Sequence, residues 1–123
     1  MLNAALASAQ WTQVADNDDA IVYTDASTMM RSANIATMWQ VNDLKVARQT
    51  LITMSAGSAY QSTKLQREYD CHAATMRTLL FTAHAGKMGS GNVVLSDADA
   101  TPWVDVSRDG NDALLLNMAC TRS

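Results

Sequence analysis

The chain has 123 residues, a length that suits one domain around a single hydrophobic core. Hydrophobic residues make up 48% of it and charged residues 17%, a balance typical of globular proteins that excludes a disordered chain. Nine basic and twelve acidic residues give a formal charge of -3 with no basic cluster, which argues against a nucleic-acid partner, and no apolar run reaches the ~20 residues of a membrane span.

The alanine-rich start of the chain resembles the end of a secretory signal. Ala5-Leu6-Ala7 and Ala7-Ser8-Ala9 both have the small-x-small pattern that signal peptidase reads. The charged and apolar parts of a signal are missing, so a flexible terminus is the alternative. We assign residues 1–10 to a signal remnant or flexible N-terminus and residues 11–123 to one domain. No cysteine follows the small residues, so a lipid anchor is not supported.

Three strands are expected in the first part of the chain. Residues 11–15 and 20–25 are short runs of strand-forming residues on either side of a polar segment, a pattern that predicts a β-hairpin. Residues 34–42 carry large side chains at every second position, which predicts a third strand.

The clearest alternation lies in residues 64–71. Leu65, Tyr69 and Cys71 share one face there, while charged and amide side chains share the other. The pattern predicts a fourth strand that ends with the thiol of Cys71 directed toward the core.

Two further strands, residues 75–83 and 92–96, bring the expected number to six. Between them the segment Gly-Lys-Met-Gly-Ser-Gly at 86–91 must be a loop. Most connections are short, so neighbouring strands should be antiparallel. The pattern between residues 44 and 55 fits a helix and a strand alike, and we expect an irregular connection with some helix.

The pattern changes to a helical period after Trp103. Asp112 falls in the first turn of the expected helix, where the helix dipole favours negative charge, and Ala113, Leu116 and Cys120 follow on one face. The sequence therefore predicts an α+β fold in which a C-terminal helix packs on the sheet.

The only two cysteines, Cys71 and Cys120, predict one disulfide between the sheet and the helix. Disulfides persist in the periplasm and outside the cell, so the bond agrees with export. Closing a loop of about 50 residues should stabilise the fold by ~4 kcal/mol. Two buried free thiols are the alternative.

Four segments of the chain agree in order and spacing with a known family. They are Trp11 with Val22-Tyr23-Thr24-Asp25, residues 60–71 (Tyr-Gln-Ser-Thr-Lys to Glu-Tyr-Asp-Cys), residues 88–94 (Met-Gly-Ser-Gly-Asn-Val-Val), and Trp103 with Ala119-Cys120. In these segments the chain resembles the bacterial surface-adhesin protein E family. The resemblance implies a six-stranded antiparallel sheet with a C-terminal helix tied by the disulfide to its concave face. It also implies export and, for the member that names the family, adhesion to host matrix proteins and a lipid anchor.

The residue patterns predict neither an enzyme nor a cofactor or metal site. His72 and His84 have no ligand partners at metal-binding spacing, and His72 beside Cys71 forms a catalytic dyad only if that thiol is free. Three carboxylates in residues 16–19 suggest calcium, but the ligand spacing of an EF-hand is missing, which favours a solvated turn.

The expected function is the binding of a protein ligand by a secreted or periplasmic protein. Tryptophan and methionine side chains suit cores and interfaces alike. We place Trp39 and Trp103 in the core, and we place Met29 and Met30 in a loop or helical turn after the second strand. The candidate binding surface consists of Tyr60, Lys87, Met88, Ser90, Met29 and Met30.

Two further expectations concern partners. The alternative function is a small periplasmic inhibitor of a hydrolase that inserts the loop from Gly86 to Gly91 into an active site. The unpaired edges of an open sheet also predict a homodimer.

Overall fold

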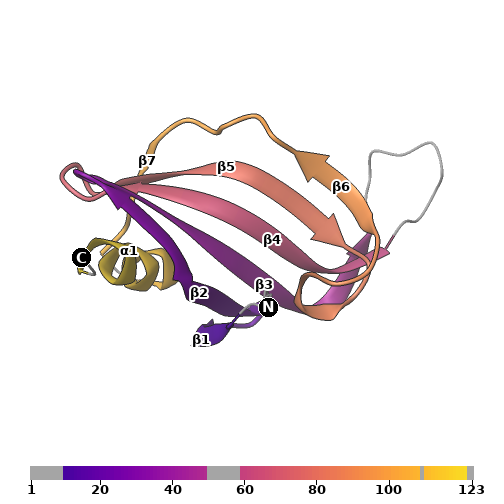
Figure 1. Ribbon diagram of the computed structural model, residues 1–123. Helices are drawn as coiled ribbons and strands as arrows, with labels where there is room; N and C mark the ends of the chain where they lie inside the picture. Colours follow the sequence, from indigo (N-terminus) through magenta and orange to yellow (C-terminus); the bar gives the residue numbers. More distant parts are fainter. Residues whose placement is uncertain (1–9, 50–58, 109, 122–123) are drawn as a thin grey trace, which may run out of the picture.

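The computed structural model describes residues 10–49, 59–108 and 110–121. Its six main strands lie side by side in chain order, and a short seventh strand pairs with the start of β5, at the opposite end of β5 from β6 (Figure 1). The elements are β1 (Thr12–Asp16), β2 (Ala20–Ser32), β3 (Ile35–Gln49), β4 (Ala59–Asp70), β5 (Thr75–His84), the 3-10 turn η1 (Lys87–Gly89), β6 (Val93–Asp97), β7 (Val104–Asp105) and α1 (Asn111–Thr121). All strand pairs are antiparallel, which confirms the predicted sheet and helix; β7 was not predicted.

Two strands are longer than the sequence pattern indicates. Met29 and Met30 lie within β2, so the predicted loop or helical turn at these residues is wrong. Strand β3 continues to Gln49, so the irregular connection predicted from residue 44 is wrong for residues 44–49. Each strand contains a bulge, between Asp25 and Met30 in β2 and between Asp43 and Arg48 in β3. A bulge changes which side chains share a face, so the period-two pattern stops at the bulge although the strand continues. Residues 50–55 of the expected irregular connection lie outside the described residues.

The buried carboxylate of Asp25 organises the bulge in β2. Its Oδ1 accepts hydrogen bonds from the amide and the hydroxyl of Ser27, and its Oδ2 accepts one from the amide of Gln10 at 2.8 Å. Burial by itself raises the pKa of this carboxyl, but the hydrogen bonds from Ser27 and Gln10 together lower the pKa below its ordinary value. The ionised carboxylate therefore fixes the bulge and the segment that enters β1.

We expect Asp25→Asn to lower the free energy of unfolding by about 1 kcal/mol at pH 7, because hydrogen bonds to a charged acceptor are stronger than those to an amide. The folded-state pKa of Asp25 is depressed, so its stabilisation is present above the ordinary value of 3.8 and is lost as pH falls through the folded-state pKa. Urea denaturation at pH 7 and pH 2.5 checks this. A difference between wild type and variant that stays constant with pH would contradict it.

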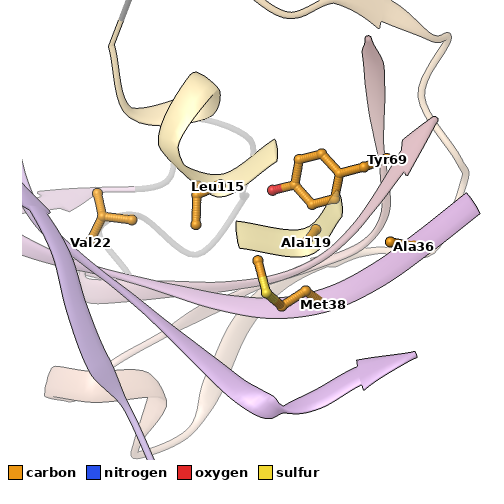
Figure 2. Close-up of a cluster of buried hydrophobic side chains, with 6 residues drawn as sticks. All are labelled: Val22, Ala36, Met38, Tyr69, Leu115 and Ala119. Atoms are coloured by element: carbon orange, nitrogen blue, oxygen red, sulfur yellow. The ribbon is translucent and has the colours of Figure 1, made fainter. Parts of the chain in front are cut away.

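The hydrophobic core lies between α1 and one face of the sheet, which we call the helix face. Leu115 and Ala119, four residues apart on one side of α1, are fully buried, whereas Leu116 and Cys120 are only partly buried beside them. The buried residues are therefore the ones directly before Leu116 and Cys120, which the sequence analysis had placed on the apolar face. The prediction was wrong by one position because apolar residues occur on all sides of this helix, so its sequence has no unique apolar face. The cluster consists of Val22, Ala36, Met38, Tyr69, Leu115 and Ala119 (Figure 2).

The disulfide joins Cys71, directly after β4, to Cys120 near the end of α1, with Cα atoms 5.6 Å apart. The predicted pairing is confirmed, and the alternative of two free thiols is wrong. Because α1 also contacts β1 to β4, the bond fastens a helix that already packs on the sheet, at the end where β4 turns into β5 (Figure 1).

Candidate functional site

The face of the sheet opposite α1, which we call the open face, carries two tryptophan–cation pairs. The Nζ atom of Lys64 lies 5.0 Å from the ring centroid of Trp39, and the guanidinium of Arg77 lies 4.6 Å from that of Trp103. Arg77 is also paired with a carboxylate oxygen of Glu68 at 2.7 Å. Such pairs hold an aromatic ring and a cation together at the surface.

Neither tryptophan lies in the core, so this prediction is wrong. Ala36 and Met38 of β3 face the helix, and alternation along the strand directs Trp39 to the open face, where it is half-buried. Trp103 precedes β7 and remains 38% exposed. The sequence shows the alternation in β3, but only the position of α1 decides which of its two faces is buried.

The glycine-rich loop at 86–91 folds back over one end of the open face. The hydroxyl of Ser62 donates to the carbonyl of Gly86 at 2.7 Å and accepts from the amide of Gly89 at 2.8 Å. The amide of Met88 donates to Oδ1 of Asp43 at 2.9 Å. Gly91 has a φ of +79°, and a Cβ there would lie 2.9 Å from the nitrogen of Gly86, so the turn requires glycine. These contacts confirm the predicted loop and fix it on the sheet.

The six residues of the candidate binding surface lie in three places. Lys87, Met88 and Ser90 share the glycine-rich loop, with Lys87 and Ser90 exposed. Tyr60 lines a cleft on the helix face. In β2, Met29 packs against the core cluster, while Met30 is 72% exposed. The structure brings only the three loop residues together, and their role in binding stays a prediction.

On the helix face, beside the N-terminal end of α1, lies a cleft of about 360 Å³ that we call the polar cleft. Two ion pairs border it: Arg67 Nη1 lies 3.6 Å from Asp112 Oδ1, and Arg48 Nη2 lies 3.9 Å from Asp19 Oδ1. Sequence reasoning considered Tyr60, Asp112 and the segment with Asn17 and Asp19, each for a different reason, and did not bring them together. The cleft is lined by Asn17, Asp19, Ala20, Val22, Gln40, Asn42, Leu44, Arg48, Tyr60, Thr63, Arg67, Phe81, Asn111 and Asp112.

Two carboxylates of the β1–β2 turn, those of Asp16 and Asp19, form ion pairs with residues of β3. Asp16 forms an ion pair with Lys45 of β3, and Oδ1 of Asn17 accepts hydrogen bonds from the amides of Asp19 and Ala20, both at 2.9 Å. Within the described residues, no group of three potential metal ligands lies together. These contacts favour the turn interpretation over calcium binding.

The two histidines lie apart. His72 is exposed in the turn after β4, and the disulfide removes the thiol on which a Cys71–His72 dyad depends. His84 is buried at the end of β5, with its Nε2 atom 2.8 Å from the hydroxyl of Thr82. In the described part of the chain, no helix has the length and apolarity to cross a membrane.

Comparison with known proteins identifies the family. Residues 11–121 match the sequence model of surface-adhesin protein E. No curated protein matches the chain in sequence. Crystal form II of Haemophilus influenzae protein E is similar in structure, with a TM-score of 0.67 at 12% identity over 89% of this chain and 86% of that one.

Two other structures of protein E agree. One from Haemophilus influenzae has a TM-score of 0.67 at 11% identity, covering 98% of this chain and 90% of that one. One from non-typeable Haemophilus influenzae has a TM-score of 0.66 at 11% identity, covering 98% of this chain and 81% of that one. Such identities show a shared fold, whereas the sequence match extends from β1 through both cysteines to the end of α1. This chain therefore belongs to the surface-adhesin protein E family.

Proposed function

We propose that this protein is exported and acts as a non-enzymatic adhesin that binds a host matrix protein through its open face. Membership of the adhesin family supports an adhesin-like role. The disulfide supports export to the periplasm or beyond, since such bonds persist in oxidising compartments. We infer in addition that α1 occupies the concave side of the sheet, which leaves the broader side free for a large partner.

The observation that carries the proposed surface is the pair of tryptophan–cation contacts. Tryptophan and arginine are enriched among the residues that dominate protein–protein binding energy. Their stacking with Lys64 and Arg77 holds the rings of Trp39 and Trp103 in place, so less conformational entropy is lost on binding. The acidic side chain of Glu68 is paired with Arg77, and the presence of both charges suits a protein partner.

The experiment uses a panel of purified extracellular matrix proteins immobilised for biolayer interferometry. We expect Trp103→Ala to weaken binding to the matrix protein that the wild type binds by about 30-fold, the effect of losing ~2 kcal/mol at a binding hot spot. Leu114→Ala is the control, because Leu114 is a 51% exposed apolar residue on α1, away from the open face. Equal losses in both variants, or a wild type that binds no matrix protein, would refute the proposal.

The two other expectations stay predictions. No contact of the glycine-rich loop favours the hydrolase inhibitor, since hydrogen bonds with Ser62 and Asp43 hold the loop against the sheet instead of extending it. A homodimer would use an edge of the sheet, and the short strand β1 (Thr12–Asp16) forms one such edge.

A further inference from the structure

Two residues that line the polar cleft each have a buried polar atom that finds no hydrogen-bond partner among the described residues. One is an acceptor, Oε1 of Gln40, and the other is a donor, Nε of Arg67. Gln40 is only 4% exposed, and its other amide atom donates to Asn42 at 2.8 Å. A buried polar group without a partner costs about 1–3 kcal/mol, so folded proteins retain few of them. Both residues therefore have an unused hydrogen-bonding atom in a cleft that the proposed adhesion surface does not use.

The sheet register places these two residues near each other on the helix face. Gln40 pairs with Leu65 and Met38 pairs with Arg67, so Gln40 and Arg67 are diagonal neighbours on the helix face. A ligand group that satisfies both residues has to donate to the carbonyl oxygen of Gln40 and accept from the guanidinium of Arg67. A hydroxyl group does both, whereas a carboxylate or phosphate oxygen only accepts and an ammonium only donates.

The charges of the polar cleft indicate a neutral ligand. Arg67 is paired with Asp112 and Arg48 with Asp19, so each guanidinium has a carboxylate beside it. An anion would approach these carboxylates, and a cation would approach the guanidiniums. The remaining polar lining is neutral and both donates and accepts hydrogen bonds; it consists of the amides of Asn17, Asn42 and Asn111 and the hydroxyls of Tyr60 and Thr63.

Aromatic rings complete the lining. Tyr60 and Phe81 both border the polar cleft and offer apolar surface for the C–H groups of a ring that has hydroxyls at its rim. The volume of about 360 Å³ lies near the lower limit for small-molecule sites. We propose that the polar cleft binds one or two rings of a neutral saccharide. This site is separate from the open face and does not depend on the adhesin proposal.

The test begins with an array of neutral, sialylated and sulfated oligosaccharides, including fragments of host glycans and of bacterial polysaccharides, probed with the full chain. We expect selection of neutral members, and the selected group shows whether the saccharide comes from host or bacterium. Titration calorimetry with a selected oligosaccharide should show at least tenfold weaker binding for Gln40→Leu. Its melting temperature should stay within a few degrees of the wild type, because removal of the unpartnered acceptor offsets the loss of the hydrogen bond to Asn42.

Gln66→Leu is the matched control, since Gln66 pairs with Trp39 on the open face and should not affect saccharide binding. Tyr60→Ala, at a half-buried residue of the cleft wall, provides a second test that leaves Gln40 in place. The proposal is overturned if the array selects only charged oligosaccharides or none, or if folded Gln40→Leu and Tyr60→Ala variants both bind as the wild type does. Trp103→Ala should retain saccharide binding, which separates this result from the outcome of the matrix-protein experiment.

Discussion

Reduction of the Cys71–Cys120 disulfide is expected to lower the melting temperature by more than about ten degrees. The bond closes a loop with a sequence separation of 49 residues, and the loss of such a constraint is worth ~4 kcal/mol. At about 4 °C per kcal/mol for a domain of this size, the shift exceeds ten degrees. Thermal unfolding followed by circular dichroism, with and without dithiothreitol, measures it.

Two variants make this experiment specific to the bond. Cys120→Ser should reproduce the shift without reductant. In a double variant, Cys71→Ser with Cys120→Ser, dithiothreitol should have no further effect. After reduction, α1 keeps its apolar contacts and the hydrogen bond from Arg31 Nη1 to the carbonyl of Cys120 at 2.9 Å, so the helix is weakened at its C-terminal end first. Ready alkylation of both cysteines in the untreated protein would show that the bond is not formed.

Leu115→Ala should lower the free energy of unfolding by about 3 kcal/mol, within the range of about 2–5 kcal/mol for a buried leucine. Leu115 has no exposed surface and packs among Val22, Met38 and Tyr69 (Figure 2). Truncation would leave a cavity between α1 and the sheet. Urea denaturation at pH 7, with a common slope for both proteins, measures the difference.

The adjacent leucine provides the control for this prediction. Leu114 is 51% exposed, and Leu114→Ala makes the same change in the same turn of α1. Its effect should stay within about 0.5 kcal/mol, as for other surface substitutions. Similar losses in the two variants would mean that α1 does not pack on the sheet through Leu115.

Most of the secondary structure could be predicted because it depends on neighbouring residues. The hairpin from β1 to β2, the strand ending at Cys71 and the glycine-rich loop each have a local pattern, and short connections make adjacent strands antiparallel. The bulges in β2 and β3 could not be predicted, because the hydrogen bond from Gln10 to Asp25 and the one from Met88 to Asp43 join residues that are distant in sequence.

Fewer contacts of the candidate sites could be predicted from the sequence. Arg77 and Trp103 stack only because β7 returns to pair with β5. Arg67 and Asp112 meet only because the helix begins beside β4. Neither pair has a local signal, since residues at such separations have no fixed spacing or period.

The sequence by itself determined the strands, the terminal helix, the pairing of Cys71 with Cys120 and the family. Alternation and turn residues are local patterns, and two cysteines allow only one pairing. Only the tertiary structure decided which face of β3 is buried, so that Trp39 lies on the open face and Gln40 in the polar cleft. The physical reason is that both faces of β3 carry large side chains, and burial depends on where α1 packs.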